Sequence, residues 1–178
     1  FEIYYQPRVS IGSNRVIGYE ALLRWHNPRR GILTPQQFIE LANDTGLIVE
    51  LDRLVLQKSS EQLSYWQCTG VDRGRMAINI STQSFRQADF IATVQQQLEQ
   101  AKLSAELFEL ALHEDIFLPA DQATHSSLQQ LINLGFHLTL DNFGEGISSL
   151  SVLQQYPLHN LKIARCFIND MEHNERQR

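Results

Sequence analysis

An acid, an apolar residue and a base alternate along one short stretch near the start of the chain. Glu20, Leu22 and Arg24 are spaced two residues apart within the run from Tyr19 to Trp25. In a β-strand such residues face the same side of the sheet. A carboxylate and a guanidinium on one face can hold a cation and an anion side by side. The same spacing also fits an ordinary half-buried strand with a surface ion pair.

Further polar side chains stand where other apolar runs end. Asn79, His113, Asp141 and Lys162 each follow or close a different strand-like segment. Ligands of α/β folds bind at the carboxyl ends of parallel strands. In a barrel, alternation with apolar neighbours would place these four side chains in the lumen. Together they indicate a site for a divalent cation and a phosphate, with Lys162 as a base or a fixed positive charge.

The segments that would position these residues alternate between strands and helices. We expect a hairpin from residues 1–9 and 15–25, a helix over 34–46 and a longer helix that ends at Gly70. Strands over 75–81, 107–114, 136–140 and 161–163 then alternate with helices over 89–101, 121–134 and 148–156. This order predicts a parallel sheet with helices outside it. An open doubly wound sheet and a barrel both satisfy the pattern.

The composition narrows the class of protein. The chain has 178 residues, a net charge of -5 and 43% hydrophobic residues, which fits one globular domain. The acidic balance argues against a nucleic-acid polymer or a membrane surface as partner. Cys68 and Cys166 lack metal-type spacing and are typical of reduced thiols in a cytoplasmic protein. Because the chain begins at Phe1, we expect an excised piece of a longer protein, which could itself be membrane-anchored.

Several motifs in register resemble the EAL domain, the cyclic di-GMP phosphodiesterase domain of bacteria, which is named for the tripeptide Glu20-Ala21-Leu22. The matching segments are Tyr5-Gln6-Pro7, Glu20 to Trp25, Thr34 to Ile39, Asn43 to Ile48, Asn79-Ile80-Ser81, Asp141 to Gly144, Ser148-Ser149-Leu150 and Leu161-Lys162-Ile163. Their order and spacing match over the whole chain.

The resemblance implies a modified (β/α)8 TIM-type barrel whose first strand is antiparallel to the rest. Residues 1–178 would form one such domain, incomplete at its C-terminus, with about six of the eight strands. Active members hydrolyse cyclic di-GMP to the linear dinucleotide with two Mg²⁺ or Mn²⁺ ions.

The resemblance also implies a role for each matching residue. Glu20, Asn79 and Asp141 would ligate metal, and Asn79 and Asp141 would also line the ligand site. Gln6, Leu22 and Arg24 would contact the nucleotide, with Arg24 on a phosphate oxygen. Lys162 would lie by the attacking water, and Glu114 would brace the loop from Phe143 to Ser149.

Three acidic positions of the family are replaced. The family's metal-binding Glu before Leu112 is Ala111, the second Asp of Asp-Asp-Phe-Gly is Asn142, and the Asp of Lys-Ile-Asp is Ala164. Since Mg²⁺ binding depends on nearby negative charge, these changes predict weak or no metal binding and make Lys162 a catalytic remnant. His113 could supply a substitute nitrogen ligand, although imidazole suits Mn²⁺ or Zn²⁺ better than Mg²⁺.

These features predict a degenerate EAL domain in bacterial signal transduction. It would act as a cyclic di-GMP receptor or as a regulatory module, joined to sensor or diguanylate-cyclase-like domains and able to form a homodimer. The alternatives are an active metal-dependent phosphodiesterase with an altered ligand set and a protein-interaction scaffold that binds no nucleotide.

Overall fold

The chain opens with an antiparallel hairpin. The structure is a computed structural model that describes residues 1–71, 74–118, 121–144 and 150–169. Strand β1 (Glu2–Val9) pairs antiparallel with β2 (Val16–Asn27), and Gln6 lies opposite Glu20. A short strand, β3 (Gly31–Leu33), pairs with the end of β2. The hairpin confirms the expectation, whereas the polar segment after His26 had not indicated β3.

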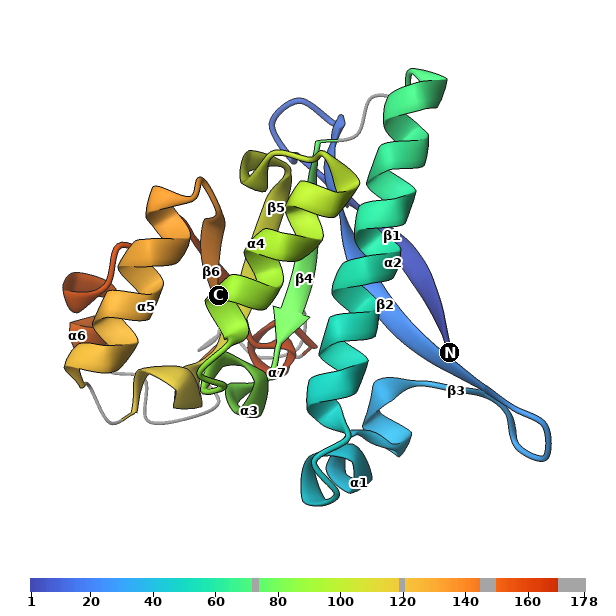
Figure 1. Cartoon of the computed structure of the whole chain (residues 1–178), viewed down its shortest axis with the longest axis horizontal. Coiled ribbons are helices and arrows are strands. Elements are labelled where there is room, and N and C mark those ends of the chain that lie inside the picture. Colours follow the sequence, from blue (N-terminus) through green and yellow to red (C-terminus); the bar gives the residue numbers. More distant parts are fainter. Residues whose placement is uncertain (72–73, 119–120, 145–149, 170–178) are drawn as a thin grey trace.

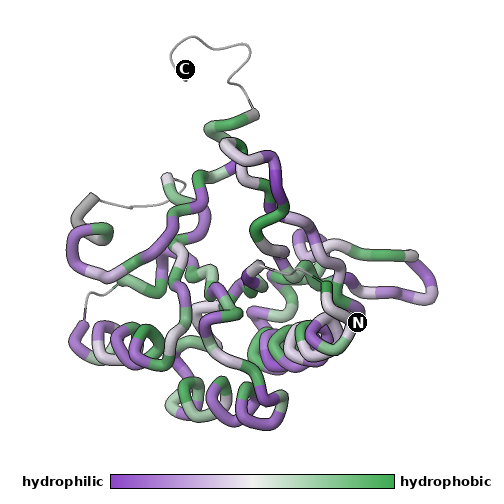
Figure 2. The backbone as a smooth tube through the Cα atoms, turned by 90° about the horizontal axis from the view of Figure 1, so that it is seen from above, coloured by the Kyte–Doolittle hydropathy of each residue, from purple (hydrophilic) through white to green (hydrophobic). Residues whose placement is uncertain are grey.

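A parallel sheet continues from the hairpin. Strands β4 (Arg75–Ile80), β5 (Phe108–His113), β6 (His137–Phe143) and β7 (Asn160–Ile163) follow β2 in that spatial order, each parallel to its neighbour. The long helices α2 (Ile48–Thr69), α4 (Phe90–Ala101) and α5 (Gln122–Asn133) lie side by side along the sheet (Figure 1). Seen from above, the three helices cover one face of the curving sheet and leave the other to the barrel interior (Figure 2).

Short helical segments connect the main elements. They are the 3₁₀ turns η1 (Pro35–Gln37), η2 (Ala105–Leu107) and η3 (Glu114–Phe117) and the helices α1 (Ile39–Asp44), α3 (Thr82–Phe85), α6 (Leu150–Gln155) and α7 (Arg165–Asn169). The expected single helix over 34–46 is two pieces, because Phe38 between them has φ -142° and ψ -9°, outside the helical region. Helices α3 and α7 had not been predicted, since each is only a few residues long.

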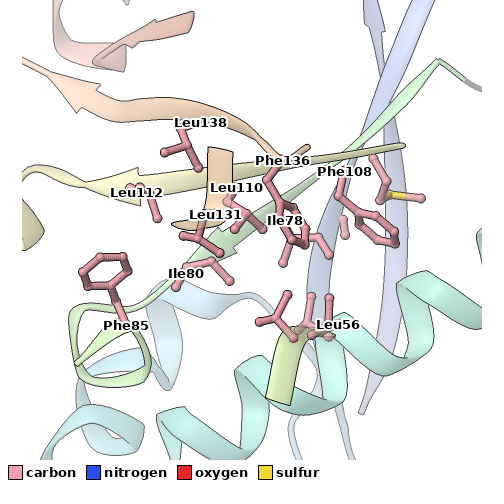
Figure 3. Packing of buried hydrophobic residues seen from close by; sticks show 14 of the residues in the cluster. Leu56, Ile78, Ile80, Phe85, Phe108, Leu110, Leu112, Leu131, Phe136 and Leu138 are labelled. Carbon is pink, nitrogen blue, oxygen red and sulfur yellow. The ribbon is translucent and has the colours of Figure 1, made fainter. Parts of the chain in front are cut away.

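The core lies between the sheet and the long helices. Ile78, Leu110 and Leu138 project from neighbouring strands towards Leu56 and Leu131 of the helices (Figure 3). These strand residues are fully buried. Because strand side chains alternate between faces, the residues between them point into the lumen. The alternation of apolar and polar residues in the sequence therefore predicted correctly which strand residues face the core and which face the lumen.

One close backbone approach fixes the junction of β2 with β4. A Cβ atom at Gly18 would overlap the carbonyl oxygen of Arg75, and one at Gly74, which has φ +55°, would overlap the carbonyl oxygen of Ile17. Only glycine at both positions lets the two backbones pair this closely. This pairing places Glu20 opposite Ala77, two residues before Asn79 on the same face of β4.

Candidate functional site

Four polar side chains from four strands meet in the lumen. The Glu20 carboxylate on β2 accepts hydrogen bonds at Oε1 from Asn79 Nδ2 on β4 (3.1 Å) and from Lys162 Nζ on β7 (2.8 Å). Lys162 Nζ also lies 3.6 Å from Asp141 Oδ1 on β6. The side chains of Lys162, Glu20 and Asp141 are 25%, 19% and 21% exposed. The structure thus joins Glu20 to three of the four residues expected at the strand ends, Asn79, Asp141 and Lys162, whereas His113 contacts Asp115 instead.

A wide cavity opens beside this cluster at the carboxyl ends of the strands. Its volume is about 570 Å³. Its walls include Asn79, Asp141, Ala111 and His113, with Asn43, Asp52, Thr82, Gln83 and Asp115 among the other lining residues. A second cavity of about 110 Å³, lined by Leu22, Pro35 and Leu51, shares Asn79 and Asp52 with it. Space of this size at this edge is suited to a ligand larger than a single phosphate.

Neutral residues occupy the three positions where the resemblance led us to look for carboxylates. Ala111 lies in register between Asn79 and Thr139 and is 2% exposed, and Ala164 is fully buried. Asn142 has a left-handed φ of +55°, and its backbone N–H donates to Asp141 Oδ1 at 2.9 Å. Asparagine tolerates this conformation better than most residues and so suits the bulge here, while its backbone N–H holds the Asp141 carboxylate in place.

The expected nucleotide-contacting residues lie along the hairpin. Gln6 is exposed opposite Glu20, and Leu22 is half-buried opposite Tyr4. The Arg24 guanidinium lies 5.5 Å from the centre of the Tyr4 ring, and its Nη1 donates to the carbonyl of Leu23. The cation–π contact with Tyr4 holds the Arg24 side chain in place, and among the described residues it makes no hydrogen bond or ion pair with the central cluster.

His113 borders the cavity next to Asp141. Its Nδ1 accepts a weak hydrogen bond from the backbone N–H of Asp115 at 3.4 Å and lies 3.2 Å from Asp115 Oδ2. The imidazole thereby caps η3. Nδ1 is engaged with Asp115, so the nitrogen that remains for the expected ligand role is Nε2.

Glu114 is buried behind the cavity. It is 4% exposed, and its Oε1 has no hydrogen-bond partner within the part of the chain that the structure describes. The loop that it is expected to brace runs from Phe143 to Ser149, and residues 145–149 lie outside the described residues. The bracing role therefore stays a prediction.

A buried ion pair beneath the site was missed in the sequence. Glu109 on β5 accepts hydrogen bonds from Arg8 (2.7 Å), Thr139 (2.7 Å) and Asn160 (3.2 Å) and is 2% exposed. Burial by itself would raise the pKa of Glu109, but the hydrogen bonds from Arg8 and Thr139, with the charges of Arg8 and Lys162, hold it below its ordinary 4.5. Glu109 alternates with the apolar Leu110 and Leu112, which puts it on the lumen side of the strand, and this was the available signal.

A second missed residue supports the strand end that carries Asn79. Asp52 on α2 accepts hydrogen bonds from the backbone N–H of Ser81 at 2.9 Å and from Ser84 Oγ at 2.6 Å. Burial raises the pKa of Asp52 although these hydrogen bonds oppose it. The carboxylate ties α2 to the turn into α3 and so fixes where β4 ends.

The chain matches the EAL domain over residues 1–178. It belongs to the EAL domain family. Two relatives from Pseudomonas aeruginosa are the cyclic di-GMP phosphodiesterase NbdA, 37% identical over 175 residues, and the bifunctional diguanylate cyclase/cyclic di-GMP phosphodiesterase MucR, 36% identical over 172 residues. The matches cover 98% and 97% of this chain but 22% and 25% of those proteins. The chain thus spans about a quarter of the length of these two relatives.

Solved EAL structures share the fold. The MucR phosphodiesterase in complex with cyclic di-GMP superposes with a TM-score of 0.93 at 35% identity, over 99% of this chain and 71% of that one. The EAL enzyme Bd1971, bound to cAMP and cyclic di-GMP, gives a TM-score of 0.92 at 27% identity over 99% of this chain and 49% of that one. These similarities, with the antiparallel β1 and the parallel strands β2, β4, β5, β6 and β7, confirm the expected α/β barrel class and decide against the open doubly wound sheet.

The donor set does not fit a pair of divalent cations. EAL phosphodiesterases are metal-dependent in general. Here Glu20 and Asp141 are the carboxylates of the cluster, and the Lys162 ammonium touches both. Within the described ranges, no group of three or more His, Cys, Asp or Glu residues is placed to hold a metal ion. We therefore derive no step that depends on Mg²⁺ or Mn²⁺.

Proposed function

We propose that this EAL domain binds cyclic di-GMP without hydrolysing it and acts as a receptor or regulatory module. The proposal rests on two features of the site. The ligand cavity is present, but Ala111, Asn142 and Ala164 are neutral. The carboxylates of the cluster, Glu20 and Asp141, both lie within ion-pair distance of Lys162. Two hard cations in one site would need several carboxylates for neutralisation, and hydrolysis in this family depends on metal ions.

The residues that remain can still recognise a cyclic dinucleotide. Arg24 provides a guanidinium two residues beyond Leu22 on β2, suited to a phosphate oxygen. Gln6 offers amide hydrogen bonds, Leu22 offers an apolar contact for a base, and Asn79 and Asp141 line the cavity floor. Such a set binds and orients the ligand, and the proposal leaves Lys162 as a fixed positive charge.

The test pairs binding with turnover in the full-length protein. Isothermal titration calorimetry should detect cyclic di-GMP binding to the wild type, and chromatography after incubation with Mn²⁺ should detect no linear dinucleotide. Arg24→Ala should weaken binding by at least about tenfold, the value of one charge-assisted hydrogen bond. The matched control Arg15→Ala, at an exposed position between β1 and β2, should bind as the wild type does. Clear production of linear dinucleotide would reject the proposal.

A hydrolytic role is the second candidate, since Glu20, Asn79, Asp141 and Lys162 converge in the lumen. It predicts metal-dependent hydrolysis that disappears in Glu20→Gln. The scaffold alternative predicts no nucleotide binding and an Arg24→Ala variant that keeps full cellular function.

The proposal also covers the ligand and the partners of the domain. Cyclic di-GMP is its proposed ligand, and attached sensor or diguanylate-cyclase-like domains and a second copy of the chain are its proposed partners. MucR is named as a bifunctional cyclase and phosphodiesterase, which supports the pairing with a cyclase-like domain. Within the described residues no helix is long and apolar enough to cross a membrane. The cytoplasmic location stays a prediction.

A further inference from the structure

We propose that the Lys162 ammonium is the resident cation of this site, so that the site needs no divalent metal to receive an anionic ligand. With Glu20 and Asp141 as its carboxylate partners and neutral residues at positions 111, 142 and 164, the ammonium alone provides the charge compensation to which metal ions contribute in the metal-dependent members. The nature of the ligand rests on the proposed function, but the claim about metal binding does not.

The contacts of Lys162 support this assignment. Its Nζ lies 2.8 Å from Glu20 Oε1 and 3.6 Å from Asp141 Oδ1, and it thus bridges carboxylates from β2 and β6. A hard cation would have to bind these oxygens at about 2.0–2.6 Å. It would then lie beside an ammonium at close range in a partly buried site, where like charges repel strongly. The ammonium and a divalent ion therefore compete for the same oxygens.

Among the residues that the structure describes, the Glu109 carboxylate adds no unpaired charge for a metal. The Glu109 carboxylate is engaged by Arg8, Thr139 and Asn160. The oxygen of Glu20 that receives Lys162 also receives Asn79. Glu20 and Asp141 against Lys162 leave a formal charge of -1 in the cluster. A formal charge of -1 is too small to neutralise two divalent ions. The single positive charge of Lys162, by contrast, is already neutralised by the two carboxylates.

The assignment makes a prediction about metal alone. Removing the ammonium uncovers the two carboxylates, so Lys162→Met should bind Mn²⁺ more tightly than the wild type. Methionine keeps most of the length of the side chain and removes the charge. The gain should be about tenfold or more, the effect of deleting one positive charge at this distance even in a water-like dielectric. Lys162→Arg keeps the charge and should show no such gain.

The experiment measures Mn²⁺ binding by the loss of free Mn²⁺ signal in electron paramagnetic resonance, with no nucleotide present. The proteins are the full-length wild type, Lys162→Met, Lys162→Arg and the control Lys58→Met, which lies on α2 beside Tyr5, away from the lumen. Circular dichroism shows which variants are folded. If Lys162→Met fails to fold, the wild-type measurement tests the assignment by itself. A wild-type dissociation constant for Mn²⁺ below about 100 μM, as expected of a dedicated metal site, would overturn the assignment.

Cyclic di-GMP titrations in EDTA and in Mn²⁺ separate this inference from the proposed function. Equal wild-type affinity in both media, with Lys162→Met binding better in Mn²⁺ than in EDTA, supports the inference. Wild-type binding that requires Mn²⁺ overturns it while nucleotide binding stands. No nucleotide binding in either medium overturns the proposed function, and a tenfold gain of Mn²⁺ affinity in Lys162→Met would still support the inference. Equal Mn²⁺ binding by folded wild type and Lys162→Met overturns it.

Discussion

Glu109→Gln should destabilise the chain by about 3 kcal/mol at neutral pH. The side chain is 2% exposed and its carboxylate accepts three hydrogen bonds, one of them from the Arg8 guanidinium at 2.7 Å. Breaking a buried ion pair by removing one partner costs about 3–5 kcal/mol. The lower end applies because Arg8 is 27% exposed and can regain some hydration. Glutamine keeps the shape and one acceptor, so the loss reports the charge.

The pH dependence makes this prediction specific. The folded-state pKa of Glu109 is below its ordinary 4.5, so the ion pair contributes its full stability above pH 4.5 and loses it as the pH falls through the folded value. Urea unfolding of wild type and variant should therefore show a difference at pH 7 that shrinks on acidification. Glu99→Gln, on the exposed face of α4, should leave the unfolding free energy essentially unchanged.

Two results would refute the reasoning. A variant as stable as the wild type at pH 7 would mean that the desolvation of Glu109 already cancels its pairing. A loss that is equal at pH 7 and at pH 3 would mean that the change acts through packing and not through charge. A double-mutant cycle with Arg8→Met should give a coupling of about 1.5 kcal/mol or more if the two charges act together.

Gly18→Ala should cost about 1–3 kcal/mol in urea unfolding because its Cβ would overlap the Arg75 carbonyl, whereas Gly12→Ala, with no atom within 4 Å, should not. Asn142→Ala should cost about 1 kcal/mol because φ is +55°, and Asn142→Gly should cost less; equal losses would contradict the backbone argument. Burial raises the pKa of Asp52 above 3.8. Its ionisation therefore removes stability as the pH rises from 3.8 through the folded value, and Asp52→Asn should flatten that slope between pH 4 and pH 7.

Alternation along the strands carried most of what the sequence could predict. Ile78 and Leu110 face the helices while Asn79 and Asp141 face the lumen, because a period of two is imposed by the strand itself. The convergence of Glu20 with Lys162 followed from parallel strands ending at one edge.

The remaining features depend on contacts that no local pattern encodes. Arg8 meets Glu109 only once the barrel curves, and Asp52 reaches Ser81 only when α2 packs against the end of β4. The left-handed turn at Asn142 arises from a bulge in the pairing of β6 with β7. Alternation predicts neither a bulge nor a three-residue strand such as β3.

The most direct measurement of the central claim is one titration of the full-length protein with cyclic di-GMP in EDTA, followed by chromatography of a parallel sample incubated with Mn²⁺. The account predicts a binding isotherm in the absence of metal and intact cyclic dinucleotide in the presence of Mn²⁺. Binding that appears only with metal, together with accumulation of the linear dinucleotide, would contradict it.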